Sequence, residues 1–567
     1  MEQYYTNERN VQILIALLKA HGIKKVVASP GSTNVTFVAS LQQDSFFEMY
    51  SSVDERSAAY IACGLAAESG ESVVLSCTGA TASRNYFSGL TEAYYRNLPI
   101  LAVTSTQDES KISHLVTQVI DRTSLPRDIA KCSVHLQNVK DADDEWDCTI
   151  KANRALLELC HRGTGPVHIN LTTTYSRDFT VKILPATRII RRVTLMDTFP
   201  ELPYGKIAIY VGTHARWTLA QLESIDAFCK AYNAVVFTDP ASNYCGKYKI
   251  PYELAALQKI DDDNKNPDLL IHIGTMSDHP TIVGTPKNVW RVAEDGEIRD
   301  RYHKLSYVFE MPEQSFFEYY SKVAVQTGDD SYFKSCMFVC ERIWNKIPEL
   351  PFSHIWIASQ LYNKFPEKSV IHLGILSPLR SWSYFNIDST IEIYCNQGGF
   401  GIDGNMSSLL GASLVHADKL YYGIVGDLSF FYDINVLGNR HVGKNIRILL
   451  INNSLGAEFH LFKQMNSIYV NEIEKYLSAA GHFGKKSPLL VKHYVEDLGY
   501  EYLSASSKEE FAKVYERFVT HAITEKPMVF EIFTDVKDED DALYAMYNIE
   551  VSAKNKVKGV LKNVLRK

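Results

Sequence analysis

Residues 421–456 have the sequence YYGIVGDLSFFYDINVLGNRHVGKNIRILLINNSLG, whose pattern is the most informative about the fold. Its pattern predicts a strand that ends at Gly426, a helix over about 429–439 and a second strand over 446–451. A right-handed crossover would place both strands in one parallel sheet. The stretch therefore predicts a βαβ unit.

Asp427 and Asn453 follow these two strands, at the sheet edge where open α/β sheets bind ligands. A carboxylate with an amide or backbone carbonyl oxygen is a ligand set suited to Mg²⁺. The alternative is that Gly-Asp begins a turn and Asn-Asn ends a strand, because these are common turn residues. Neither half of the pattern decides between the two readings by itself.

The same alternation of short β-branched runs and helical segments continues through all 567 residues, in runs such as KKVVAS, GPVHINL, DLLIHIGT and PMVFEIFT. It predicts an α/β fold of three consecutive domains with mainly parallel sheets flanked by helices. We place the domains at 1–185, 186–335 and 336–567. The Pro-punctuated stretch 182–204 is interpreted as a linker.

Composition excludes several classes of function. The chain has 59 Lys and Arg against 66 Asp and Glu, a net charge of −7, and no basic stripe interleaved with aromatic residues, so we expect no nucleic-acid partner. Its ten cysteines include no C-x-x-C pair and are interpreted as reduced thiols. No signal-peptide pattern and no 18-residue apolar run occurs, so we expect a cytoplasmic protein with no membrane partner.

Glu55 stands at the start of a small, apolar helical pattern, VDERSAAYIACGLA, residues 53–66. One interpretation is an acid that complements the helix macrodipole. The other is a carboxylate held in an apolar site to move a proton. The residues around Glu55 alone leave both open.

Taken together, Gly426-Asp427 and Asn452-Asn453 resemble the motif of thiamine-diphosphate (ThDP) enzymes, which begins with Gly-Asp and ends about 26 residues later with Asn-Asn. The resemblance implies that Asp427, the Asn453 side chain and the Leu455 carbonyl hold Mg²⁺ against the cofactor diphosphate. It also implies that Glu55 bonds to the aminopyrimidine and promotes loss of the thiazolium C2 proton. The macrodipole interpretation of Glu55 then becomes the weaker one.

ASPGSTNVTF (28–37), VDERSAAY (53–60), GIDG (401–404) and GDLSFFYDIN (426–435) resemble the MenD branch, whose synthase joins decarboxylated 2-oxoglutarate to isochorismate. By this resemblance Ile402 supports the bent cofactor, although plain core packing explains it equally well. Further cofactor contacts are implied for Gly426, Leu428, Ser429 and Ser377. The resemblance also implies a homodimer or homotetramer, because the cofactor lies between the first domain of one subunit and the third domain of another.

The match fails at positions where the family uses arginines to bind carboxylates. Thr33, Gln107 and Gln397 stand at three of them, while Gln118 and Arg380 match the family pattern. We expect all five on the substrate side of the site, with Gln118 and Arg380 as catalytic residues beside Glu55. One arginine then remains as an anchor for a substrate carboxylate.

Four further residues have no assigned role: Glu458, His460, His114 and His279. Glu458 and His460 replace a Gly-rich loop and would be either proton carriers or solvated, structurally paired groups. His114 would lie one helical turn from Gln118.

The expected function is ThDP- and Mg²⁺-dependent decarboxylation of a small 2-oxo acid, with transfer of the acyl carbanion to an unknown acceptor. The expected substrates differ from those of MenD, and no flavin is expected. The alternatives are a simple 2-oxo acid decarboxylase, a true MenD synthase, and a non-catalytic binding protein on an enzyme fold.

Overall fold

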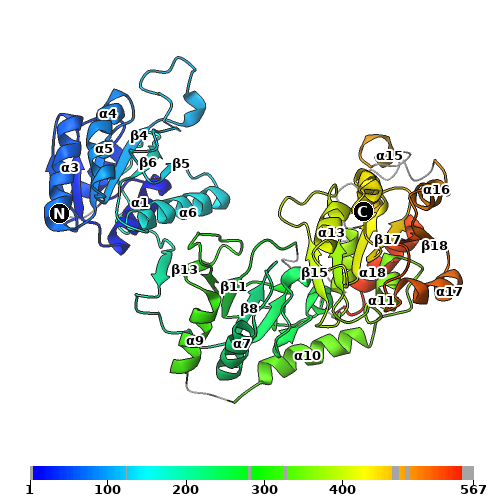
Figure 1. Ribbon diagram of the computed structural model, residues 1–567. Helices are drawn as coiled ribbons and strands as arrows, with labels where there is room; N and C mark the ends of the chain where they lie inside the picture. The colour runs from blue at the N-terminus through cyan, green and yellow to red at the C-terminus, as the bar shows by residue number, and fades with distance from the viewer. Residues whose placement is uncertain are drawn as a thin grey trace, which may run out of the picture. The chain divides into compact units, whose positions relative to one another are not determined.

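The computed structural model describes residues 4–122, 124–278, 282–324, 328–462, 472–478 and 486–551. Internal contacts divide the chain into two compact units. The first comprises Met1–Thr198 with Gly296–Glu310, and the second Phe199–Asp295 with Met311–Lys567. Figure 1 shows mainly parallel sheets flanked by helices, which confirms the predicted α/β class.

The first unit is built on a six-stranded parallel sheet of order β2-β1-β3-β4-β6-β5. Its elements are α1 (Arg9–Ala20), β1 (Lys25–Ala28), α2 (Val35–Gln42), β2 (Glu48–Ser51), α3 (Glu55–Ser69), β3 (Val73–Thr78), α4 (Thr81–Asn85), α5 (Phe87–Tyr95), β4 (Ile100–Thr106), η1 (Glu109–Lys111), β5 (Ser133–Leu136), α6 (Ala142–Glu158), β6 (Val167–Thr172), β7 (Arg191–Thr194) and β13 (Leu305–Glu310).

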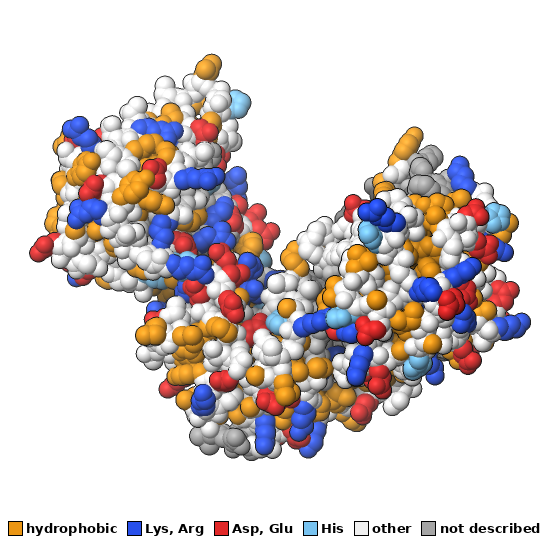
Figure 2. All heavy atoms as spheres, viewed as in Figure 1, with side chains coloured by type: hydrophobic (Ala, Val, Ile, Leu, Met, Phe, Trp, Pro, Cys, Tyr) orange, Lys and Arg blue, Asp and Glu red, His pale blue; other side chains and the backbone are white. Residues whose placement is uncertain are grey.

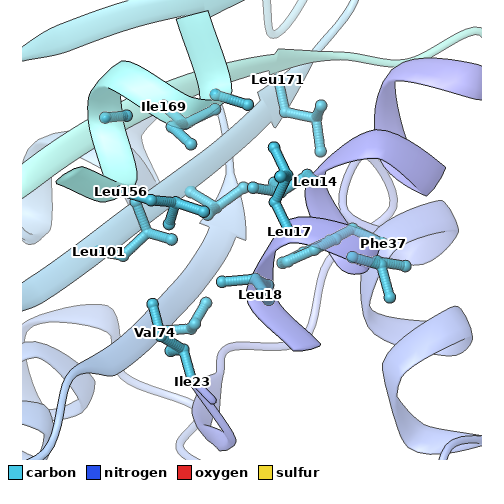
Figure 3. Packing of buried hydrophobic residues seen from close by; sticks show 14 of the residues in the cluster. Leu14, Leu17, Leu18, Ile23, Phe37, Val74, Leu101, Leu156, Ile169 and Leu171 are labelled. Atoms are coloured by element: carbon cyan, nitrogen blue, oxygen red, sulfur yellow. The ribbon is translucent and has the colours of Figure 1, made fainter. Parts of the chain in front are cut away.

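One face of this sheet is covered by α1, whose Leu14, Leu17 and Leu18 are fully buried (Figure 3). They belong to one core cluster with Val74 of β3 and Leu156 of α6. Each buried leucine contributes roughly 1.5–3 kcal/mol to folding. Val73 and Leu75 of β3 point to the opposite face from Val74 and belong to a second core cluster with residues of α3 and α5, so both faces of the sheet are packed.

The second unit contains two parallel sheets. The strands β10-β9-β8-β11-β12 form the first, and the order of the second is β15-β14-β16-β17-β19-β18. The elements around the first are β8 (Ile207–Val211), α7 (Leu219–Tyr232), β9 (Val235–Thr238), η2 (Pro240–Ser242), β10 (Lys249–Ile250), α8 (Glu253–Leu257), β11 (Leu269–Ile273), β12 (Asn288–Val292) and α9 (Glu313–Val323). Those around the second are α10 (Ser331–Trp344), α11 (His354–Leu361), β14 (Val370–Leu373), α12 (Ser377–Ser383), β15 (Glu392–Cys395), α13 (Asn405–Ser413), β16 (Tyr421–Gly426), α14 (Asp427–Tyr432), η4 (Ile434–Gly438), β17 (Ile446–Asn452), η5 (Ala457–His460), α15 (Ile473–Tyr476), α16 (Leu490–Asp497), β18 (Glu501–Ala505), α17 (Lys508–Phe518), β19 (Met528–Phe533) and α18 (Val536–Tyr547).

The predicted βαβ unit is confirmed in its strands and wrong in its helix. β16 and β17 are parallel neighbours with Gly426 opposite Ile451. The helix begins at Asp427 and ends at Tyr432, and a 3-10 turn follows. Asp433 interrupts it, because its carboxylate accepts hydrogen bonds from the Ser407 backbone N–H (2.7 Å) and hydroxyl (2.6 Å).

The linker interpretation of 182–204 is also wrong in part. Residues Arg191–Thr194 form β7, which pairs in parallel with β13. The strand is defined by its pairing, with Arg191 opposite Tyr307 and Thr194 opposite Glu310, and Val193 is its buried residue. The prolines on either side of β7 led the sequence pattern to predict a linker instead of a strand. The predicted domain boundaries at 185/186 and 335/336 stay predictions.

Candidate active site at the sheet edge

Asp427 lies at the carboxyl end of β16, where it is the first residue of α14. The residue is only 4% exposed. Its carboxylate accepts a hydrogen bond from the Leu428 backbone N–H at 2.8 Å and a longer one from the Gly456 N–H at 3.4 Å. Burial raises the pKa of Asp427, and these backbone N–H groups only partly oppose it.

Asn453 follows β17 on the next strand of the same sheet. Its side-chain oxygen accepts hydrogen bonds from the backbone N–H groups of Leu455 and Ala457, both at 3.1 Å. These bonds hold the loop 453–457 in a tight turn that brings Gly456 to Asp427. The structure therefore brings together the two residues on which the sequence prediction of a metal site depended.

Gly456 is required for this turn. Its φ is +61°, and a Cβ atom there would lie 2.4 Å from Cδ1 of Leu428. The left-handed backbone and the close packing both exclude a side chain. Sequence reasoning missed Gly456, although a glycine four residues after the polar end of a strand, at Asn452, is a recognisable turn signal.

The residues at this edge fit a divalent cation. Asp427 is a buried carboxylate that meets no basic side chain in the described part of the chain, and a buried charge without a counter-charge is unfavourable. In the same described residues no group of three or more His, Cys, Asp or Glu side chains surrounds a possible metal position. A mixed set of carboxylate, amide and backbone oxygens, completed by phosphate oxygens, is the kind of set Mg²⁺ takes.

Ser429 and Ile402 are linked directly. The Ser429 hydroxyl donates to the Ile402 carbonyl oxygen (2.7 Å) and accepts from the Asn405 side-chain amide (2.8 Å). The Ile402 side chain is half-buried, and its backbone is fixed next to the start of α14. Asn405 was missed because a buried asparagine at a helix start has no distinctive sequence pattern.

Arg380 and Ser377 both contact Glu458. The Ser377 hydroxyl donates to Oε2 of Glu458 at 2.9 Å, and the Arg380 guanidinium forms an ion pair with the same oxygen. Burial opposes the charge of Arg380, but the Glu458 carboxylate outweighs it and raises the arginine's pKa. Of the two readings of Glu458, the structurally paired one is confirmed. Nε2 of His460 is buried and has no hydrogen-bond partner among the described residues.

The turn before Ser377 carries backbone strain. Leu376 has φ +66° and ψ −120°, a region that side-chain-bearing residues rarely occupy. Ser377 then begins α12, the helix that carries Arg380, with Pro378 in its first turn. Strained residues of this kind concentrate at functional sites, where the surrounding packing holds them.

In the first unit, Glu55 is the first residue of α3 and directly follows the β2 edge. Asp54 caps this helix by accepting from the Ser57 N–H at 2.8 Å. Asp54 is therefore the N-cap of α3, and Glu55 is the acid in its first turn, a position that also complements the helix macrodipole. The Glu55 carboxylate is half-exposed and makes no hydrogen bond to the described residues.

The small residues of α3 do not surround Glu55 within its own unit. The small buried residues of α3 face the domain interior, where Ala59 packs so closely that a Cβ on Gly89 would lie 2.4 Å from it. The apolar side chains that remain exposed near Glu55 are Val53 (82%), Tyr60 (47%) and Ile61 (44%). Figure 2 shows hydrophobic side chains on the surface of this unit.

The predicted substrate residues of the first unit differ in their environment. Thr33 is buried, and its hydroxyl donates to the Ser105 carbonyl oxygen. Gln107 is half-buried, and its amide oxygen accepts from Nζ of Lys111 at 2.6 Å. Gln118 is exposed with φ +65°.

The expected helical turn between His114 and Gln118 is absent. Ser113, Leu115 and Gln118 all have positive φ, and both His114 and Gln118 are exposed. The pairing inferred for these two residues therefore loses its basis. His279 lies outside the described residues.

Gln397, the third neutral position, is buried at 2% exposure. Its amide group donates to Asp239 (2.9 Å) and Thr213 (3.2 Å), and its oxygen accepts from the Asp278 N–H (2.8 Å). All its strong polar contacts are made within the protein. Gln397 therefore links its own loop to the segments that follow β8, β9 and β11 in the second unit.

Sequence comparisons give the family. Residues 9–125 match the model of the thiamine pyrophosphate enzyme N-terminal TPP binding domain. Proteins named 2-succinyl-5-enolpyruvyl-6-hydroxy-3-cyclohexene-1-carboxylate synthase from Phocaeicola vulgatus and Bacteroides thetaiotaomicron are each 31% identical over 97% of this chain and all of their own length. One from Flavobacterium psychrophilum is 26% identical over 93% of the chain and 96% of its own length.

The chain belongs to the MenD family of ThDP enzymes. It is therefore a ThDP-dependent enzyme of the transferase or lyase type, and its cofactors are ThDP and a divalent metal such as Mg²⁺. The resemblance noted from the motifs is confirmed. No helix in the described ranges is both long and apolar enough to span a membrane.

Proposed function

We propose that this MenD-family enzyme decarboxylates a small 2-oxo acid and joins the remaining acyl group to an acceptor. Its substrates would differ from 2-oxoglutarate and isochorismate, the pair that the MenD resemblance implies. The observation that carries the proposal is the combination of a Mg²⁺-compatible edge at Asp427 and Asn453 with neutral Thr33, Gln107 and Gln397. The metal edge supports ThDP chemistry. The three positions at which the family binds substrate carboxylates with arginine are neutral here.

Each residue at the second unit's edge has a role in this proposal. Asp427, Asn453 and the Leu455 carbonyl would hold the metal, with Gly426, Leu428, Ser429 and Ser377 around the cofactor. ThDP supplies the carbon centre that attacks the 2-oxo group and stabilises charge when CO₂ leaves. Ile402 would support the cofactor, because Ser429 holds its carbonyl at 2.7 Å.

Glu55 would accept and return a proton at the cofactor's aminopyrimidine. A half-exposed carboxylate without a hydrogen-bond partner in the described residues is available for that contact. Gln118 would face the donor acid from the exposed loop after η1, and Arg380 would line the donor side of the second unit.

We also propose a homodimer or homotetramer built from the domains 1–185, 186–335 and 336–567. Glu55 and Asp427 belong to different compact units, and the exposed Val53, Tyr60 and Ile61 near Glu55 would be covered in an assembly. Sedimentation velocity tests this: a monomer that nonetheless turns over would contradict it. We propose a cytoplasmic location and small-molecule partners only.

A second candidate is the synthase reaction implied by the MenD resemblance, addition of a decarboxylated 2-oxo acid to isochorismate. The observation that favours it is 31% identity along nearly the whole chain. The arginine replacements count against it, because each lost charged contact to a buried carboxylate costs roughly 2–5 kcal/mol.

One experiment separates the candidates. The purified protein with ThDP and Mg²⁺ is given a panel of 2-oxo acids, and CO₂ release is followed with and without aldehydes, ketones and isochorismate. A ligated product from an acceptor other than isochorismate supports the proposal. A product only from 2-oxoglutarate and isochorismate establishes the second candidate, and ThDP binding without CO₂ release from any donor would overturn both.

A further inference from the structure

Arg380 is the one family arginine retained among the substrate positions compared above, yet its charge is already paired. Its guanidinium and the Ser377 hydroxyl both bind Oε2 of Glu458. The Arg380 and Glu458 side chains are only 19% and 15% exposed. Arg380, which could bind a substrate carboxylate, therefore binds the Glu458 carboxylate of the same chain.

The pair lies beside the candidate metal edge. α12, which carries Ser377 and Arg380, follows β14, and β14 is the parallel neighbour of β16. Glu458 is in η5, directly after the loop that packs on Asp427. Strand order and loop connection place the Arg380–Glu458 pair at the same edge as the proposed chemistry.

We infer that Glu458 acts as a built-in anion that neutralises Arg380, so that the enzyme selects a donor 2-oxo acid whose side chain carries no second carboxylate. The inference rests on the proposed function and names its substrate class. A dicarboxylic donor would have to displace Glu458 and leave that carboxylate unpaired in a largely buried place, which is strongly unfavourable. A donor with a neutral side chain meets no net charge.

The test compares two donors of similar shape. 2-Oxoglutarate carries the second carboxylate, and in 5-methyl-2-oxohexanoate an isopropyl group takes its place. The parent enzyme should show kcat/KM for 5-methyl-2-oxohexanoate at least about 10-fold above that for 2-oxoglutarate, the difference expected from one unfavourable charge. A preference of the parent for 2-oxoglutarate overturns the inference without any variant.

Glu458→Gln should then free Arg380 and move the ratio toward 2-oxoglutarate by roughly 10- to 100-fold. Glu458→Gln combined with Arg380→Met should lose that gain. The matched control is Glu525→Gln, which removes a carboxylate from the exposed ion pair with Lys444 (2.8 Å) and should leave the ratio unchanged. A folded Glu458→Gln variant with the parent's ratio would contradict the inference.

A binding measurement separates this inference from the proposed function. Glutarate, an unreactive dicarboxylate, should raise the thermal midpoint of the cofactor-free Glu458→Gln variant and leave that of the parent unchanged. If no donor releases CO₂ but glutarate still distinguishes the two proteins, the proposed function fails while the masked anchor stands. Equal glutarate responses in both proteins refute the anchor whatever the activity.

Discussion

Asp427 and Glu55 occupy the same local position in two different units. Each is the first residue of a helix that directly follows or soon follows a parallel strand. Asp427 is 4% exposed and enclosed by its own unit, whose loop around Gly456 returns to it. Glu55 is half-exposed, and no described hydrogen bond reaches its carboxylate.

This difference in burial distinguishes the two halves of the proposed site, the metal edge at Asp427 and the region around Glu55. The metal edge is assembled inside one unit, where backbone N–H groups and Asn453 fix its shape before any ligand arrives. The half around Glu55, for which we propose proton transfer, presents a carboxylate beside exposed apolar residues and would depend on a contact from elsewhere. The four variants below test whether this contrast is real.

Glu55→Gln should have the largest effect. The amide keeps the size of the side chain but cannot exchange a proton, so turnover should fall by about 10²- to 10⁴-fold. Affinity for ThDP, measured by calorimetry, should stay within a few-fold because the metal edge is untouched. Glu68→Gln, an exposed change on the same helix, is the control; unchanged kcat in Glu55→Gln would sink the assigned role.

Asp427→Asn should show the complementary pattern. Removing the buried charge takes away a metal ligand, so Mg²⁺-dependent ThDP affinity should fall by roughly 100-fold or more. Cofactor-free protein should remain folded, since the amide no longer buries an uncompensated charge. Calorimetry and circular dichroism measure the two effects, with exposed Asp497→Asn as control. Full ThDP affinity in Asp427→Asn would place the metal elsewhere.

The sequence predicted the two strands that precede Asp427 and Asn453 better than the segments around them. The strand pattern before Asp427 and Asn453 depends on local apolar runs, and period and length are sufficient to locate such strands. The helix end at Tyr432 depends on Asp433 meeting Ser407, a contact between segments 26 residues apart. No local pattern contains that information.

The same limit applies to the polar residues. Gln397 and Arg380 were both placed on the substrate side by resemblance, but the structure gives each a partner inside the protein. Those partners, Asp239 and Glu458, come from distant segments. A single sequence shows which residue types are present, whereas pairing depends on the fold.

Glu539→Gln tests how pH affects the stability of the second unit through a buried carboxyl group. Burial raises the pKa of Glu539 to about 7, while its carboxylate accepts from Thr534 (2.7 Å) and the His354 N–H (3.0 Å). The folded state therefore holds this proton more tightly than the unfolded chain, in which the carboxyl has the ordinary glutamate pKa of 4.5. The stability that this contributes is present below pH 4.5 and lost as the pH rises through about 7.

The parent should consequently lose up to about 3 kcal/mol of stability over that interval, which Glu539→Gln avoids. Urea unfolding should find the variant more stable at pH 8, by about 1–3 kcal/mol after the cost of a weakened hydrogen bond, and no more stable at pH 4.5. Exposed Glu516→Gln should follow the parent at both values. A variant advantage that does not depend on pH would rule out this titration.

Gly456→Ala should have the smallest effect and tests whether the metal edge is preformed. A Cβ at φ +61° costs about 1–2 kcal/mol, and its contact with Leu428 adds to that cost. Because the Gly456 N–H meets Asp427, ThDP affinity should fall together with stability. Adding Leu428→Ala should recover the stability lost to the contact with Leu428 but not the stability lost to the left-handed backbone.

Gly411→Ala is the matched control, since Gly411 lies inside α13 with no atom near its Cβ position, and helix propensity then favours alanine. If Gly456→Ala lowered stability as expected yet bound ThDP as tightly as the parent, the cofactor would be shaping this edge on arrival, and the contrast between an enclosed metal half and an open proton-transferring half would disappear.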